Sequence, residues 1–139
     1  MVNVISYDRR QAVFLPPDLC DWIGDDDLVH FITAAVERVE IGVFKVNWRG
    51  HGKAQYHPRM VLALLIYCYA NGIFSSRRIE SATHRDVVVR FIAADTHPDH
   101  DTIATFRREN LEAFTIAFHQ VLILAMELSL LSLGMVSID

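Results

Sequence analysis

The sequence predicts a mainly helical domain, a bundle of helices with strand confined to the last few residues and to part of 42–57. Acidic residues at 25–27 and at Asp101 stand where helix N-termini need caps, and long apolar stripes follow at a spacing of about 3.6 residues. The length of 139 residues suits one domain with a proper core, and the hydrophobic content of 52% argues against intrinsic disorder.

The first part of the chain is expected to be irregular. Residues 1–24 have no clean period and precede a helical domain expected over 25–133. The aspartates at 25–27 cap a helix expected over 28–40. Segment 42–57, with three glycines, is expected to be a loop.

Two helices are predicted after that loop. Pro58 opens a helix that is apolar nearly all round and ends at 71–72, so we expect it at the centre of the core. In the next helix a serine at 75 or 76 caps the start, and Ile79 with Ala82 or Thr83 forms a narrow inward face. The side chains left pointing outward are Arg77, Arg78, Ser81 and Arg85.

Residues 86–94 are ambiguous because valines favour a strand, but Val88, Phe91 and Ile92 recur at helical spacing and we expect a helix. A turn over 95–100 then leads to a short helix capped by Asp101. That helix turns Ile103 and Phe106 inward. Its other face carries Thr102, Thr105 and Arg108, with Arg107 at the flank.

A long helix is expected from Asn110. Its apolar stripe comprises Leu111, Phe114, Phe118, Val121, Leu122, Ala125, Leu128 and Leu131. Residues 134–139 then form the start of a strand. Glu127 interrupts the most apolar segment, 121–138, and makes a membrane span unfavourable. No signal peptide is evident, and two cysteines without ligand spacing suit a reducing, cytoplasmic setting.

Charge is distributed unevenly along the chain. Residues 1–44 carry three basic and eight acidic side chains, residues 45–108 ten and five, and residues 109–139 none and four. The middle of the chain is therefore an electropositive region between acidic flanks. Such a region is typical either of phosphate contacts or of a solvated face.

The stretch "HPDHD", 97–101, offers four potential metal ligands, namely His97, Asp99, His100 and Asp101. One five-residue loop rarely encloses a tetrahedral ion by itself, and zinc sites generally draw ligands from two segments. His51 and His57 are candidates for a second pair, but nothing relates their spacing to the first. A turn at Pro98 followed by a helix cap explains the cluster without an ion.

Two short helices with hydroxyls and arginines on their outer faces resemble a helix-turn-helix layout. The candidate DNA contacts are Arg77, Arg78, Thr102, Thr105, Arg107 and Arg108. The alternative is an ordinary helical bundle with a basic surface, and spacing alone does not separate the two because the turn is long.

Three segments carry a family resemblance: "YHPRMVLALLIYCYANGIFSSRRIE" (56–80), "PDHDTIATFRREN" (98–110) and "LGMVSID" (133–139). Together they resemble the N-terminal region of bacterial insertion-sequence transposases of the DDE type, the InsH-like N-terminal domain. The resemblance covers about residues 14–139. It implies a domain that engages the terminal inverted repeats of the element and helps assembly, in the bacterial cytoplasm at the nucleoid.

The resemblance also implies a ribonuclease-H-like domain whose first strand begins in 134–139. Asp139 would be the first of three catalytic carboxylates, which hold Mg²⁺ in a full-length transposase. One carboxylate does not build a two-metal site, so we expect this chain, as a relic or a fragment, to be catalytically inactive alone and to need no cofactor.

Three function hypotheses follow. The leading one is a DNA-binding and assembly domain of a transposase. The alternative is a helical protein-interaction module, in which helix 110–131 pairs with another subunit, as in a homo-oligomer, without direct DNA contact. A self-sufficient metal-dependent hydrolase is the weakest of the three.

Overall fold

A computed structural model of the chain describes residues 6, 8–10, 18–45 and 55–128. Across those ranges the regular structure is helical and no strand is present, which confirms the mainly helical class. The elements are the short 3-10 helices η1 (Leu19–Trp22) and η2 (Ile41–Val43) and the α-helices α1 (Leu28–Val36), α2 (Pro58–Ala70), α3 (Ser76–Arg85), α4 (Val87–Ile92), α5 (His100–Glu109) and α6 (Leu111–Glu127).

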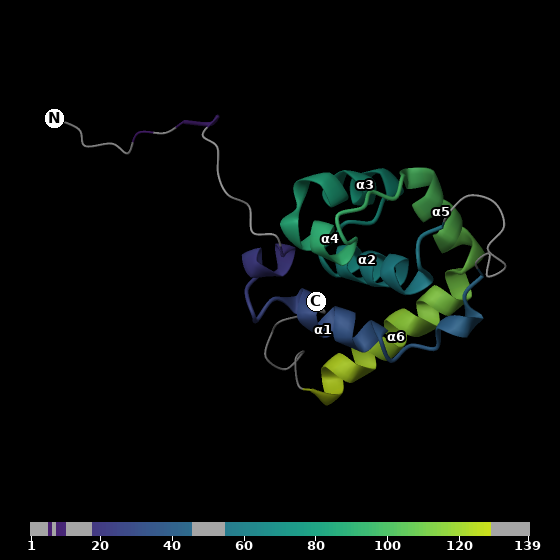
Figure 1. The fold of residues 1–139 in the computed structure, drawn as a ribbon. Coiled ribbons are helices and arrows are strands. Elements are labelled where there is room, and N and C mark those ends of the chain that lie inside the picture. The colour runs from purple at the N-terminus through teal and green to yellow at the C-terminus, as the bar shows by residue number, and fades with distance from the viewer. Residues whose placement is uncertain (1–5, 7, 11–17, 46–54, 129–139) are drawn as a thin grey trace.

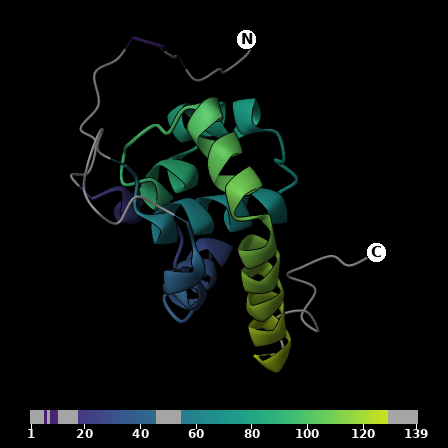
Figure 2. The ribbon, with the colours of Figure 1, turned by 90° about the vertical axis from the view of Figure 1, so that its right-hand side faces the viewer.

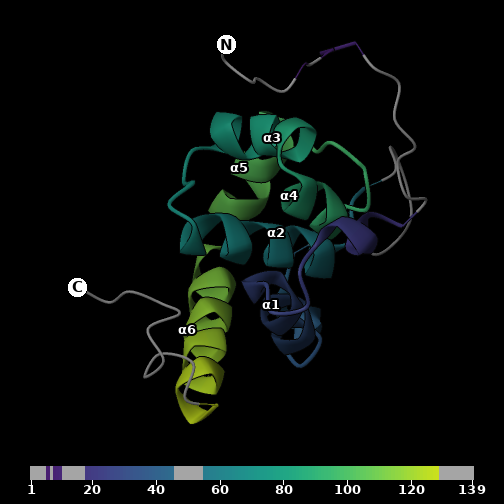
Figure 3. The same ribbon diagram turned by 90° about the vertical axis from the view of Figure 1, so that its left-hand side faces the viewer.

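Helix α2 lies in the middle of the fold (Figure 1). The group α3, α4 and α5 covers one side of it, and α1 lies on the opposite side together with the start of α6 (Figure 3). Contacts join α2 to both α1 and α4, and α3 to both α4 and α5. The central position predicted for the helix that opens at Pro58 is therefore confirmed.

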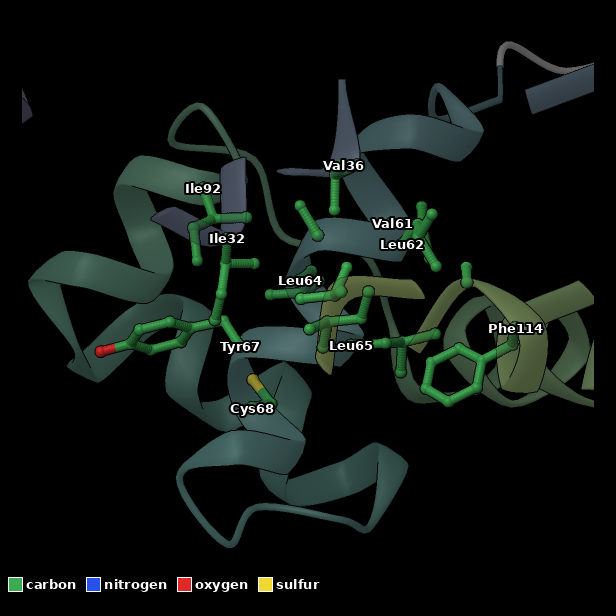
Figure 4. Packing of buried hydrophobic residues seen from close by; sticks show 14 of the residues in the cluster. Ile32, Val36, Val61, Leu62, Leu64, Leu65, Tyr67, Cys68, Ile92 and Phe114 are labelled. Carbon is green, nitrogen blue, oxygen red and sulfur yellow. The ribbon is translucent and has the colours of Figure 1, made fainter. Parts of the chain in front are cut away.

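The core is built around the side chains of α2 (Figure 4). Leu62, Leu64 and Leu65 are fully buried, although they point to different sides of the helix, because other helices surround α2. Full burial of one such side chain contributes about 1.5–3 kcal/mol relative to leaving it in water. The nearly uniform apolar character of α2 in the sequence is thus a consequence of its central place.

Polar side chains set where the helices begin. Each accepts a hydrogen bond from an amide of the first turn, which otherwise has no partner in the helix. The capping residues are Asp27 for α1, His57 for α2, Ser75 for α3, Asp86 for α4 and Asp99 for α5. The expected helix over 86–94 is confirmed, although Val89 and Ile92 are its buried residues and Val88 is only half-buried.

The cap of α5 corrects the prediction, which assigned it to Asp101. The helix begins two residues earlier than predicted, at His100, and Asp99 Oδ1 accepts from the Thr102 amide at 2.7 Å. The reason lies in α3, where Glu80 Oε1 accepts from the His100 amide at 2.7 Å. That contact satisfies the first amide of the helix, and Asp101 is left exposed in the first turn.

Helix α1 ends at Val36, four residues before the predicted end at Glu40. The guanidinium of Arg59 explains the early end, because Nη1 donates to the carbonyls of Val36 at 2.6 Å and Val39 at 3.3 Å. Carbonyls at a helix end need such donors. The chain then turns so that Val39 is buried, and η2 follows.

Helix α6 buries a narrower stripe than predicted. Its buried residues are Phe114, Ala117, Val121 and Ala125, and the predicted stripe members that are exposed instead are Leu111, Leu122 and Leu128. The C-terminal half of α6 extends away from α2 and the α3–α5 group (Figure 2), and among the described elements α1 packs against one side of α6. Leu131 lies outside the described residues.

Of the two predicted strand segments, 42–57 is described in part and 134–139 is not described. In 42–57 the described residues contain the end of η2 and an extended stretch before α2, and 46–54 lie outside the description, as do 134–139. In the irregular segment 1–24, η1 is a short 3-10 helix capped by Asp18. No helix in the part of the chain that the structure describes is long and apolar enough to cross a bilayer.

Candidate nucleic-acid interface

The local sequence of α3 determines which of its side chains face solvent. Ser75 Oγ accepts from the Arg78 amide at 3.1 Å and starts the helix, and Ile79, Ala82 and Thr83 are buried. These three residues occupy one side of the helix, so residues about half a turn away must point outward. The predicted inward face of this helix is confirmed.

Three arginines occupy the outer face of α3. Arg77, Arg78 and Arg85 are exposed, and none of them forms an ion pair within the described residues. Glu80, the only carboxylate in the helix, is half-buried at the edge toward α5. The outer face is therefore a cationic surface whose guanidinium groups are available to an anion.

Helix α5 lies beside α3 and buries Ile103 and Phe106, as predicted. Arg108 is exposed, and its Nη2 lies 3.5 Å from the Thr105 hydroxyl, which is a weak contact. Thr102 and Thr105 line an open hollow. Acidic side chains share this hollow with them, and its full lining is Lys45, Gln55, Tyr56, Val61, Asp99, Asp101, Thr102, Thr105, Phe106 and Glu109.

Arg107 points inward, toward the turn between α2 and α3. Its Nη1 donates to the Tyr69 hydroxyl at 2.9 Å and to the Phe74 carbonyl at 2.7 Å, and its Nη2 donates to Ser76 Oγ at 2.7 Å. Its Cζ also lies 6.0 Å from the centre of the Tyr69 ring. The guanidinium of Arg107 is thus occupied by contacts that hold α5 against α2 and α3.

Glu80 and His100 join α3 to the start of α5. Glu80 Oε1 lies 2.8 Å from His100 Nδ1 and also accepts from the His100 amide. The hydrogen bonds from the His100 side chain and from its amide hold the pKa of Glu80 below its ordinary value. The carboxylate is therefore ionised at neutral pH, and its Oε1 is engaged by His100.

A second histidine contact lies beside this junction. The rings of His84 on α3 and His97 in the loop before α5 stack with centroids 3.8 Å apart and planes 12° from parallel. His97 Nδ1 lies 3.1 Å from the buried Thr83 hydroxyl, which holds the loop against α3. Two stacked imidazoles close to three arginines place several titratable donors on one surface.

The four potential ligands of the "HPDHD" stretch do not converge. Asp99 caps α5, His100 pairs with Glu80, and His97 stacks on His84. Within the described ranges no group of three or more His, Cys, Asp or Glu side chains is placed to hold a metal ion. Asp139, predicted from the resemblance as a catalytic carboxylate, lies outside the described residues.

The predicted contact residues thus fall into two groups. Arg77, Arg78, Thr102 and Arg108 are exposed, whereas Thr105 and Arg107 are half-buried. The prediction omitted two exposed neighbours on α3, His84 and Arg85. Their spacing from Arg77 by seven and eight residues places all three on one helical face, which is the signal that identifies them in the sequence.

Comparison with known proteins gives one family match. The model of a family described as "Transposase domain (DUF772)" matches residues 17–109, which include α1 to α5 and therefore both helices of this surface. Neither a curated protein nor a solved structure matches the chain.

Proposed function

Because the chain belongs to the transposase domain family, and so has a role in DNA transposition, we propose that it is the DNA-binding and assembly domain of an insertion-sequence transposase. Its ligand would be the terminal inverted repeats of the element, which it would meet at the bacterial nucleoid. The observation that carries the proposal is the outer face of α3, where Arg77, Arg78 and Arg85 have no ion partner in the described structure.

Unpaired arginines on one helical face suit the DNA backbone. A guanidinium presents donors in a planar fork that matches two phosphate oxygens. Each phosphate that a basic side chain neutralises releases counterions, which is the main source of affinity for DNA of any sequence. The only carboxylate of α3, Glu80, is engaged by His100 and offsets little of this attraction.

Helix α5 supplies the second part of the proposed interface, in a layout like a helix-turn-helix although α4 lies between the two helices in sequence. Arg108 is its exposed cation, and Thr102 and Thr105 offer hydroxyls that can reach base edges. The neighbouring carboxylates of Asp101 and Glu109 repel phosphate, so α5 contributes less to backbone affinity than α3 does.

A titration with labelled inverted-repeat DNA at several salt concentrations tests the proposal. We expect the triple variant Arg77→Ala/Arg78→Ala/Arg85→Ala to bind more weakly. The salt slope, meaning the slope of log affinity against log salt concentration, should decrease in magnitude by about three, because each lost phosphate contact removes roughly 0.9. All three residues are exposed, so the variant should remain folded, which circular dichroism checks.

A matched control has the same change in net charge. Arg9, Arg10 and Arg38 are exposed, and replacing all three with alanine removes three positive charges that belong to neither α3 nor α5. We expect this control to keep the slope of the wild type. Equal affinity of wild type and α3 variant for inverted-repeat DNA would show that the basic face is only a solvated surface.

Helix α6 supports the second candidate function, a protein-interaction module. Leu111 is 61% exposed, Ile116 52% and Met126 62%, which is a large apolar area for one helix. Light scattering of the wild type and of Ile116→Ser/Met126→Ser would detect self-association through this helix. A change in mass with these substitutions, together with unchanged DNA binding by the α3 variant, would favour the interaction module.

A catalytic role for Asp139 is proposed only from the family resemblance. There, Asp139 would be one ligand of Mg²⁺, and a two-metal site needs several ligands with ions roughly 3.5–4 Å apart. The described residues do not provide such a ligand set, and we derive no catalytic step from them. The proposed function therefore rests on DNA contact and assembly.

A further inference from the structure

An open hollow of about 430 Å³ lies on the outer side of α3, next to the start of α5. It is lined by Arg77, Glu80, Ser81, His84, Arg85 and His100. One lining group is the Glu80 carboxylate, which accepts a hydrogen bond from the His100 amide. The other lining groups are two guanidinium groups, a hydroxyl and two imidazoles. These are the donors that proteins use to hold a phosphate group.

The two imidazoles of this hollow differ in their surroundings. His100 Nδ1 is 2.8 Å from Glu80 Oε1, and its Nε2 is 3.6 Å from Asp101 Oδ1, so carboxylates lie on two sides of its ring. His84 has no carboxylate within ion-pair distance in the described structure. It instead stacks on His97 at 3.8 Å.

His84 shares the hollow with two guanidinium groups and is stacked on a second imidazole. Arg77 and Arg85 line the same hollow as His84, and a second imidazolium on His97 would lie parallel to it at 3.8 Å. Like charges at that distance repel.

The acidic groups near the pair are already engaged. Asp95 Oδ1 bonds Arg90 at 2.8 Å, Asp99 caps α5, and Glu80 pairs with His100. Histidine normally changes charge between about pH 5 and 8, so an imidazole in this hollow can gain a proton when an anion binds beside it.

We propose that this hollow holds one backbone phosphate of DNA and that its binding takes up a proton on His84. The inference rests on the proposed function, and it adds the hollow and the role of His84 to it. A phosphate between Arg77 and Arg85 reverses the local field, so the imidazolium of His84 gains a negative partner. The bound state then holds the proton more tightly than the free state, and by linkage DNA binds more tightly as the pH falls.

Fluorescence anisotropy with a fluorescein-labelled duplex at constant ionic strength measures the effect. For the wild type we expect affinity to increase about sixfold between pH 8 and pH 6, because an increase of about one unit in the pKa on binding gives its full tenfold effect only over a wider pH range. His84→Gln keeps a polar side chain of similar reach but does not titrate. We expect its affinity at pH 8 to match the wild type and most of its pH dependence to be lost.

The matched control is His119→Gln. His119 is an exposed residue of α6, so this variant loses one titrating charge outside the hollow. Lowering the pH charges every histidine and strengthens binding to any polyanion, and the control measures that general effect. We expect its affinity ratio between the two pH values to equal that of the wild type.

Calorimetry in two buffers of different ionisation enthalpy counts the protons directly. Wild type and His119→Gln should take up a similar fraction of a proton near neutral pH, and His84→Gln clearly less.

Equal uptake or equal pH dependence in wild type and His84→Gln would overturn this inference but leave the proposed function intact. Absence of DNA binding at every pH would overturn the proposed function itself. Displacement of the duplex by micromolar inorganic phosphate would assign the hollow to a free anion and overturn the DNA assignment.

Discussion

Replacing Arg107 tests whether this arginine stabilises the fold or contacts DNA. Its guanidinium donates three hydrogen bonds, of 2.9, 2.7 and 2.7 Å, to Tyr69, Phe74 and Ser76. These acceptors lie 31 to 38 residues away in sequence, so the contact ties α5 to the turn between α2 and α3. We expect Arg107→Ala to destabilise the fold and to leave the DNA salt slope unchanged.

The expected loss of stability follows from the number of bonds. A hydrogen bond contributes about 1 kcal/mol net, and more when one partner is charged. Water can replace part of the loss because Arg107 is only half-buried, so we expect about 2 kcal/mol for the three bonds together. In a domain of this size that corresponds to a decrease in Tm of roughly 10 °C.

Arg108→Ala is the matched control, because it removes the same side chain from the next position of the same helix. Arg108 is exposed, and its contact with Thr105 is long, at 3.5 Å. We expect its stability to change by less than about 0.5 kcal/mol. If Arg108 reads a guanine, its loss should instead cost about 1–3 kcal/mol of binding at the specific site only.

Urea unfolding followed by circular dichroism gives the free energies of unfolding of the two variants. Fluorescence anisotropy below the transition temperature gives the dependence of their DNA affinity on salt concentration. The assignment of Arg107 would be refuted if Arg107→Ala unfolded at the same urea concentration as the wild type. A decrease of about one unit in its salt slope would then identify Arg107 as a phosphate contact, as the sequence suggested.

Three further predictions concern single contacts. Asp99→Ala removes the α5 cap and should lower the free energy of unfolding by about 1 kcal/mol in urea titrations, whereas Asp101→Ala should not. A larger loss for Asp101→Ala than for Asp99→Ala would instead support Asp101 as the cap, as predicted from the sequence. Hydrogen bonds from His100 and Arg90 lower the pKa values of Glu80 and Asp95, so their contribution to stability is present above the ordinary carboxyl range and is lost as pH falls below it. The decrease in Tm between pH 7 and pH 3 should therefore be smaller for Glu80→Gln than for the wild type. Equal decreases for the two proteins would contradict the stabilising role of the Glu80 carboxylate. Burial raises the pKa of the Cys68 thiol to about 12. A thiol reagent at pH 8 should therefore label the half-buried Cys20 first and Cys68 only after unfolding. Equal labelling rates for the two cysteines would disprove this.

Local rules explain the features that the sequence determined correctly. The start of α3 at Ser75 and the burial of Ile79 depend on a short cap and on helical spacing, and both act within a few residues. The central position of α2 followed from its apolar composition on all sides, because such a helix is stable only when other elements surround it. The helical class and the candidate cationic face of α3 were therefore predictable without coordinates.

Contacts between distant segments decided the rest. Helical spacing placed Arg107 at the flank of α5, but only the packing of α5 against the turn at Phe74 shows that its donors are occupied. In the same way, the cap of α5 passed to Asp99 because Glu80, twenty residues earlier, reaches the His100 amide. The apolar period of α6 could not show that Leu111 is exposed, since exposure depends on where the neighbouring helices end. The sequence thus determines which side chains share a helical face, and the tertiary structure decides which of them remain available to a ligand.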